Sequence, residues 1–164
     1  MPYSRDGAPA PGAGDPADPA APASGALRDG RHLLPVRVYY EDTDFSGVVY
    51  HASYLRFLER GRTEFLRAAG VGQSALHAEG GLIFAVRRLT VDYLRPARMD
   101  DVLHVETRTA EVRGASLAVA QRILRDGEAL VTADVRVAAL MDGRTARIPD
   151  SLRAILSGGE DGRS

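Results

Sequence analysis

The feature that most restricts the fold is a series of four stretches, within residues 82–141, in which apolar residues recur at every second position. A period of two is typical of strands that bury one face. Arg113-Gly114 and Asp126-Gly127 separate successive stretches by short glycine turns, which predicts antiparallel hairpins. The four predicted strands span residues 82–94, 102–112, 116–125 and 129–141.

The segment before these strands predicts one long helix. Between Ala52 and Ala69 the apolar side chains fall on a single stripe at helical spacing, and Gly61 lies on the same face. Glycine costs a helix interior about 1 kcal/mol relative to alanine. Its place on the apolar stripe therefore predicts that a sheet approaches the helix closely there. The stripe consists of Tyr54, Leu55, Leu58, Phe65, Leu66 and Ala69.

A further strand is predicted ahead of the helix, because Val36 to Tyr40 is β-branched and aromatic. The order of one strand, one long helix and four antiparallel strands predicts an α+β fold, with a five-stranded antiparallel sheet wrapped around one central helix. Such a sheet has edge strands, which proteins usually pair or cover. We therefore expect a homodimer with a continuous sheet. Pro149 to Leu156 predicts a short final helix.

The ends of the chain differ from its middle in composition. Residues 1–30 hold six of the nine prolines and few large apolar side chains, which predicts a disordered tail. Residues 31–157 form the predicted domain, and residues 158–164 are expected to fray. Gly12–Ala17 superficially resembles a dinucleotide-binding motif, but no strand precedes it and Pro16 stands where the helix would begin.

Composition excludes several classes of function. A net charge of −1 gives no electrostatic footprint for nucleic acid. No run of 18 or more apolar residues or secretory signal is found, so neither membrane insertion nor export is expected and we predict a cytoplasmic protein. The absence of cysteine excludes disulfides and a thiol nucleophile, and the absence of lysine excludes a Schiff base.

Acidic residues, a glycine and a histidine gather between the first strand and the helix. Asp44 stands seven residues before His51 with Gly47 between them, so the carboxylate can fold back toward the N–H groups that begin the helix. A carbonyl oxygen bound there would be polarised as in an oxyanion hole, where one donor is worth about 3 kcal/mol. Asp44 can then attack the acyl carbon or act as a general base. Tyr40 can hydrogen-bond into the same pocket, or it can be an ordinary packed tyrosine.

Two simpler interpretations stay open on spacing alone. Asp42 and Asp44 can cap turns while His51 only begins the helix, which would leave the segment without chemistry. Residues 42–47 also copy the opening of a calcium loop, but Ser53 stands where that loop needs a glutamate. The remaining histidines lack partners at useful spacing and are expected at the surface: His32, His77 and His104.

Two segments, Val38–Asp44 and Gly47–Tyr54, together resemble the acyl-CoA thioesterases of the 4-hydroxybenzoyl-CoA thioesterase family, and most closely the branch associated with the bacterial Tol-Pal system. The similarity extends from about Val36 to Leu140 and includes Glu59–Glu64 on the helix. The resemblance implies the hotdog fold, which agrees with the predicted order of elements. It also implies dimers or tetramers with active sites at the dimer interface.

The resemblance further implies hydrolysis of acyl-CoA to a free acid and CoA, without a metal or organic cofactor. Asp44 matches the position of the family's catalytic carboxylate, and the backbone N–H of His51 matches the donor to the thioester carbonyl. Tyr40 and the His51 side chain match positions implicated in this branch. The expected substrate-binding residues are Gly47, Val49, Tyr50 and Arg113, with Arg113 the candidate for the CoA phosphates.

Other functions remain possible for the same fold. A module that binds acyl-CoA or acyl carrier protein without hydrolysis would need the same site. A dehydratase acting on hydroxyacyl thioesters is disfavoured. The pattern typical of such enzymes has the acid or histidine on the helix, whereas Asp44 precedes the glycine turn. The sequence leaves open the acyl group, the choice between CoA and carrier protein, the choice between an anhydride intermediate and general-base catalysis, and the choice between dimer and tetramer.

Overall fold

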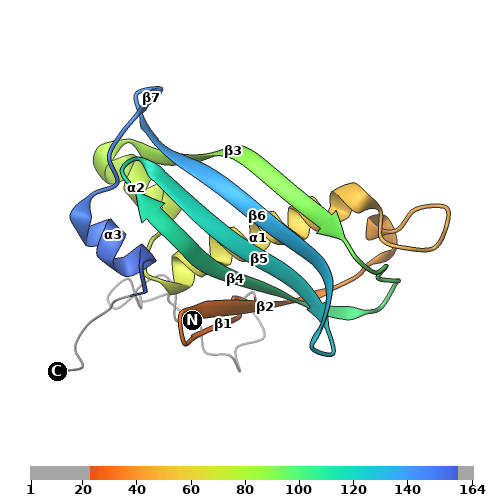
Figure 1. Cartoon of the computed structure of the whole chain (residues 1–164). Coiled ribbons are helices and arrows are strands. Elements are labelled where there is room, and N and C mark those ends of the chain that lie inside the picture. The colour runs from red at the N-terminus through yellow and green to blue at the C-terminus, as the bar shows by residue number, and fades with distance from the viewer. Residues whose placement is uncertain (1–22, 159–164) are drawn as a thin grey trace, which may run out of the picture.

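The computed structural model describes residues 23–158, which form one antiparallel sheet around a long helix (Figure 1). The sheet order is β1-β2-β4-β5-β6-β3, and β7 pairs with β6. The elements are β1 Ala26–Arg28, β2 Arg31–Arg37, the 3₁₀ turn η1 Tyr40–Asp42, α1 His51–Ala68, α2 Gln73–Gly80, β3 Leu82–Tyr93, β4 Val102–Arg113, β5 Ser116–Arg125, β6 Glu128–Met141, β7 Arg144–Thr145 and α3 Asp150–Leu156.

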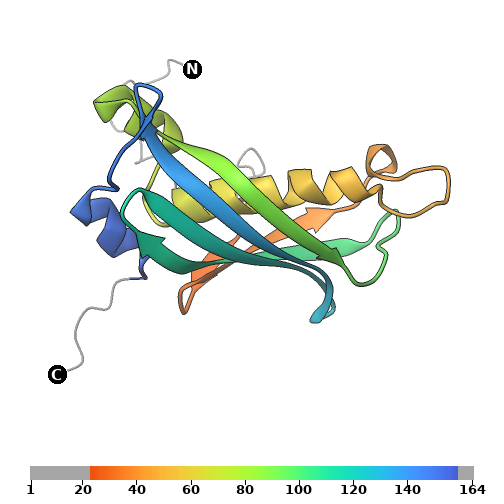
Figure 2. The same ribbon diagram turned by 45° about the horizontal axis from the view of Figure 1, so that its top comes forward.

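The predicted architecture is confirmed, because α1 runs along one face of the curved sheet in both views (Figures 1 and 2). The expected five strands correspond to β2 to β6, and the structure adds the short strands β1 and β7. The hairpin turns are also as predicted, since Gly114, Asp126 and Gly127 have positive φ angles. Within residues 23–158, no helix is both long and apolar enough to span a membrane.

The long-range pairing of β3 could not be read from the sequence. β3 pairs with β6, while β4 pairs with β2. The segment between β3 and β4, which contains Pro96, takes the chain from the β3 edge of the sheet, past β6 and β5, to the position beside β2. As a result, β3 is an outer strand of the sheet.

The strand predicted over Val36–Tyr40 ends earlier than expected. β2 stops at Arg37, and Tyr40 lies in η1. The reason is the buried carboxylate of Asp42, whose Oδ2 accepts a hydrogen bond from the Tyr39 N–H at 2.8 Å and turns the chain. Tyr40 therefore lies beyond the strand predicted to include it, and its exposed side chain is not the packed tyrosine of the second interpretation.

Two further elements were not predicted. Ala26–Arg28 fall in the last part of the expected tail but form β1, which the Asp29-Gly30 turn pairs with β2. The helix α2 begins shortly after α1, and its C-terminal cap is Gly81 in the left-handed conformation. Residues 1–22 of the expected tail and residues 159–164 of the expected frayed end lie outside the described residues.

Gly61 lies where the sheet passes closest to α1. A Cβ atom on this residue would lie 2.5 Å from Cγ1 of Val105 and 3.0 Å from Oγ1 of Thr107, both on β4. The close approach predicted from its place on the apolar stripe is confirmed. Gln121 of β5 reinforces the contact, because its side-chain amide donates to the Leu58 carbonyl at 2.8 Å.

His32 is buried, so the prediction that it lies at the surface is wrong, whereas His77 and His104 are exposed. Its Nε2 lies 2.7 Å from the carbonyl oxygen of Ser24, which links β2 to the chain before β1. Burial lowers the pKa of His32, although the hydrogen bond to Ser24 and the charge of Glu64 act in the opposite direction. The imidazole is therefore held neutral in the folded protein near neutral pH.

This burial predicts a loss of stability on mild acidification. As pH falls through the ordinary histidine pKa of 6.5, the unfolded chain takes up a proton before the folded chain does, so the free energy of unfolding decreases. We expect the melting temperature to fall between about pH 7 and 5.5. The variant His32→Gln keeps a donor for Ser24 but does not titrate, so its decrease should be smaller. Identical pH profiles for the two proteins would contradict the assignment.

Candidate active site

The segment before α1 forms a narrow turn. Thr43 and Val49 form an antiparallel bridge, and the Asp44 N–H donates to the Val48 carbonyl at 3.0 Å. The Gly47 N–H donates back to the Asp44 carbonyl at 3.0 Å, and Gly47 has a φ of +81°. Glycine adopts this left-handed conformation without steric cost, which explains its place in the turn. The chain folds back as the spacing of Asp44 and His51 predicts.

The Asp44 carboxylate is exposed at the start of this turn. The N–H and the hydroxyl of Ser46 both donate to its Oδ1, the former at 2.8 Å. These two hydrogen bonds are the main reason why the pKa of Asp44 lies below its ordinary value, and the nearby His51 adds to the effect while partial desolvation opposes it. Asp44 is therefore ionised at neutral pH, as a nucleophile or general base requires.

Backbone hydrogen bonds fix where α1 begins. The Tyr50 N–H donates to the Asp42 carbonyl and the Val49 N–H to the Ala97 carbonyl, each at 2.8 Å. The next two backbone N–H groups, those of His51 and Ala52, meet no acceptor among the described residues. The first N–H groups of a helix have no partner within the helix and carry its positive dipole end. They are thus available to a carbonyl oxygen of a ligand.

Aromatic side chains surround the first turn of α1. The centroid of the His51 ring lies 4.5 Å from that of the Tyr50 ring. It lies 6.3 Å from that of the Tyr93 ring, in an edge-on arrangement. The Tyr93 hydroxyl donates to the His51 carbonyl at 3.1 Å, and its ring lies 5.8 Å from that of the buried Tyr54. Tyr93 was missed in the sequence, because only the position of β3 in the sheet brings its last residue to the helix start.

The structure separates the predicted residues into two groups. Gly47, Tyr50 and His51 lie with Asp44 in the turn and the first helical turn. Val49 also lies there, but its side chain is buried in the core and is not available to a ligand. Tyr40 lies in η1, is 79% exposed, and uses its carbonyl to bind the Thr43 hydroxyl.

The alternative in which the acids only cap turns holds for Asp42. Its side chain is buried, and it caps η1 through Tyr39. Asp44 also organises its turn through Ser46, but its carboxylate stays at the surface. Asp44 can therefore organise its turn and still present its carboxylate to a substrate, whereas the buried carboxylate of Asp42 cannot.

Arg113 lies apart from the other predicted residues. It is the last residue of β4, beside the β4–β5 turn, where its side chain is 83% exposed and pairs with Glu111 at 2.8 Å. The carbonyl of the neighbouring Gly114 accepts a hydrogen bond from Arg153 of α3 at 3.0 Å. Figure 1 shows α3 and this turn at one end of the sheet and the segment before α1 at the other. A single chain therefore does not bring Arg113 to Asp44.

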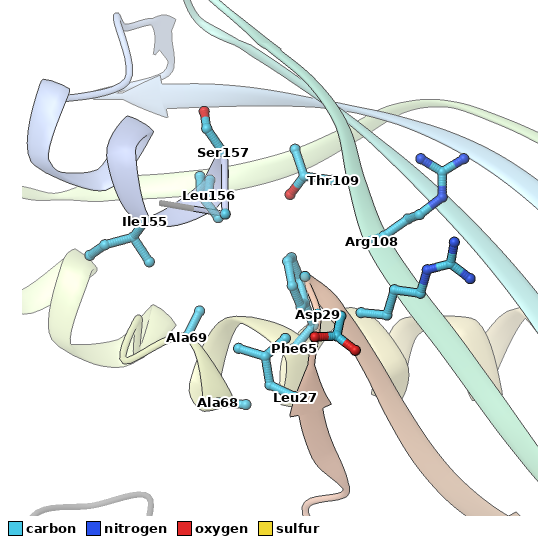
Figure 3. A pocket seen from close by; sticks show the side chains of 13 residues that line it. Leu27, Asp29, Phe65, Ala68, Ala69, Arg108, Thr109, Ile155, Leu156 and Ser157 are labelled. Carbon is cyan, nitrogen blue, oxygen red and sulfur yellow. The ribbon is translucent and has the colours of Figure 1, made fainter. Parts of the chain in front are cut away.

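Five cavities within residues 23–158 lie away from Asp44. One of about 620 Å³ opens between β1, α3 and the end of α1, where Leu27, Phe65 and Leu156 face polar side chains that include Arg108 (Figure 3). Neither it nor four smaller cavities within residues 23–158 is lined by Asp44, His51 or Tyr40. The exposed Asp44 thus lies outside these five cavities.

Comparison with known proteins points to one family. The profile of the Thioesterase-like superfamily matches residues 38–156. The acyl-CoA thioesterase YbgC of Haemophilus influenzae is 48% identical over 118 residues, which cover 72% of this chain and 87% of that protein. The crystal structure of a probable thioesterase from Bartonella henselae is 43% identical with a TM-score of 0.70, covering 73% of this chain and 99% of that one.

A more distant structure bears on the fold alone. A 4-hydroxybenzoyl CoA thioesterase mutant, complexed with 4-hydroxybenzoyl CoA, superposes with a TM-score of 0.74 at 22% identity. The superposition covers 78% of this chain and 99% of that one. The two proteins thus share the sheet and its helix, although their sequences are only 22% identical.

Proposed function

The chain belongs to the thioesterase-like superfamily, and from this membership we propose that it hydrolyses acyl-CoA thioesters to a free carboxylic acid and CoA. Membership confirms the family and the hotdog fold expected from the motif, and the YbgC relatives fit the expected Tol-Pal-associated branch. The observation that carries the proposal is the position of the ionised Asp44 carboxylate, one glycine turn before the free amides of α1.

In the proposed mechanism, the thioester carbonyl oxygen binds the N–H groups of His51 and Ala52. The positive end of the helix dipole then stabilises the charge that develops on this oxygen. Asp44 either attacks the acyl carbon, which expels the CoA thiolate and leaves an anhydride for water to cleave, or removes a proton from the attacking water. Both routes require the ionised form of Asp44.

The other predicted residues support this reaction in different ways. Gly47 permits the turn, and Val49 anchors its end in the core. The ring of His51 contacts those of Tyr50 and Tyr93, and His51 is near enough to Asp44 to help lower the pKa of its carboxylate. We propose that the exposed Tyr40 contacts the substrate once a partner subunit covers this surface.

The direct test is hydrolysis of a panel of aliphatic and aromatic acyl-CoA substrates by the purified protein, with the released thiol detected by a thiol reagent. We expect turnover on at least one substrate class. The same acyl groups on acyl carrier protein would identify the preferred carrier. No release of thiol from any substrate would remove the proposal.

A second candidate is a module that binds acyl-CoA or acyl carrier protein without hydrolysing it. One observation favours it: the Asp44 carboxylate is exposed in the single chain and lies outside the five cavities described above, whereas electrostatic catalysis is most effective in a site that excludes water. Mass analysis of the bound ligand separates the two functions. Intact thioester after long incubation supports the binding module, whereas free acid supports the hydrolase.

We also propose that a homodimer completes the site. β3 lies at the end of the sheet order, and its Ile83 and Val86 are 44% and 49% exposed, respectively. Phe45, next to Asp44, is fully exposed. Pairing of two such edges would extend the sheet and cover these apolar side chains. Light scattering should give the mass of a dimer or of a tetramer built from it, and a fully active monomer would contradict the proposal.

A further inference from the structure

We propose that Tyr93 is a positioning residue of the active site, whose hydroxyl group orients and polarises the peptide group that carries the Ala52 N–H. This role rests on the proposed function, in which that N–H binds the thioester carbonyl oxygen. Tyr93 is the last residue of β3, and in both views β3 ends on the side of the molecule where α1 begins (Figures 1 and 2). It thus reaches the helix from a strand 42 residues further along the chain than His51.

One hydrogen bond joins the Tyr93 hydroxyl to the backbone of α1. The hydroxyl donates to the His51 carbonyl at 3.1 Å. A helix carbonyl ordinarily accepts one N–H from the residue four positions further on. A carbonyl oxygen has a second lone pair, which can accept another donor. The hydroxyl can therefore add to the helical hydrogen bond of this carbonyl without replacing it.

The His51 carbonyl and the Ala52 N–H belong to the same peptide group. Such a group is planar, and its C=O and N–H point in opposite directions, so a donor that holds the oxygen also fixes the direction of the N–H. Hydrogen bonds in series also polarise one another, by roughly 10–30% per bond. The Tyr93 hydroxyl therefore makes the Ala52 N–H a stronger donor. Among residues 23–158 this N–H meets no acceptor, so its donor capacity is left for a ligand.

Tyr93 is fixed in place by core contacts. Its backbone pairs with Val131 of β6, and its ring centroid lies 5.8 Å from that of the buried Tyr54. The Tyr54 hydroxyl accepts a hydrogen bond from the Ala97 N–H at 2.9 Å, and the Ala97 carbonyl accepts one from the Val49 N–H at 2.8 Å. The segment after β3 is thus tied both to α1 and to the turn before it. Donors held in advance in this way stabilise developing charge without reorganisation during the reaction.

Two other roles of the hydroxyl would have different effects. A hydroxyl that only clamps the end of the helix would contribute to stability and leave the rate unchanged. A hydroxyl that binds the substrate directly would act on KM. The variant Tyr93→Phe keeps the ring that contacts His51 and Tyr54, and the ring is partly exposed, so loss of the hydroxyl leaves no buried cavity. This substitution therefore isolates the hydroxyl.

The kinetic test compares the wild-type full chain with Tyr93→Phe, and Tyr39→Phe serves as the matched control because Tyr39 has an exposed ring and no part in the proposed mechanism. With the best substrate of the panel, kcat of Tyr93→Phe should fall about tenfold, less than the roughly hundredfold or greater cost of losing a whole oxyanion donor. KM and the melting temperature should stay near those of wild type and control. An unchanged kcat, or a rise in KM alone, would overturn the proposal.

A second measurement needs no turnover. Asp44→Asn and Asp44→Asn/Tyr93→Phe are loaded with octanoyl-CoA or benzoyl-CoA that carries an isotope label in the thioester carbonyl, and the carbonyl stretching frequency is measured by infrared difference spectroscopy. Binding should lower this frequency less in the double variant, because its Ala52 N–H is the weaker donor. Equal frequencies in the two variants would overturn the proposal. If wild type hydrolyses no substrate, the proposed function fails, but a smaller lowering in the double variant still supports the role of Tyr93 toward a bound thioester.

Discussion

The variant Asp44→Asn is expected to lower kcat for acyl-CoA hydrolysis by about a thousandfold or more. Asparagine cannot attack the acyl carbon as a carboxylate does, and it cannot accept a proton from water. Loss of the attacking group or its base typically costs several orders of magnitude in rate. The asparagine oxygen can still accept the hydrogen bond from the Ser46 N–H, so the turn should remain folded.

The measurement is steady-state turnover of the best substrate from the panel, with the melting temperature as a check on folding. Asp92→Asn serves as the control, because Asp92 is an exposed aspartate on β3 outside the Asp44 turn. We expect the control to retain wild-type turnover. Full turnover by Asp44→Asn would exclude Asp44 as nucleophile and as general base, and would transfer the chemistry to another group.

A second readout separates the two routes open to Asp44. In a single turnover in heavy-oxygen water, an anhydride intermediate can place the label on the Asp44 carboxylate when water attacks its carbonyl. Direct attack of water on the thioester would place the label only on the released acid. Finding the label on Asp44 would assign the nucleophilic role, since a general base forms no bond to the acyl group.

Local patterns were sufficient for the elements that lie within one stretch of sequence. The alternation in β6 and the glycine turns beside Gly114 and Gly127 gave the hairpins to within about one residue. The apolar stripe of α1 likewise gave the helix and the special place of Gly61. In each case, neighbouring residues alone decide which face is buried.

Features that depend on distant contacts were missed. The pairing of β3 with β6, and hence the place of Tyr93 beside His51, follows from how the chain crosses the sheet. His32 is buried because the chain at Ser24 packs against β2. The sequence around His32 gives no sign of this contact, so a surface position was expected. The separation of Arg113 from Asp44 is of the same kind, because hairpin direction sets which end of the sheet a turn occupies.

The variant Gly61→Ala is expected to destabilise the protein by about 1–3 kcal/mol, although alanine favours helix by about 1 kcal/mol. The added Cβ would lie 2.5 Å from Cγ1 of Val105, a distance that real contacts do not show. Val105 is fully buried in β4, and the same Cβ would lie 3.1 Å from Nε2 of Gln121. Neither neighbour can move away without disturbing the core or the hydrogen bond to Leu58.

Gly80→Ala in α2 provides the matched control. An added Cβ at Gly80 would meet nothing within 4 Å, so this substitution should be neutral or slightly stabilising. Thermal unfolding should therefore show a decrease of roughly 2–4 °C for each kcal/mol lost in Gly61→Ala and no decrease in Gly80→Ala. If both variants gain stability, helix propensity outweighs packing at Gly61, and the sheet does not approach α1 as closely as the distances to Val105 and Gln121 require.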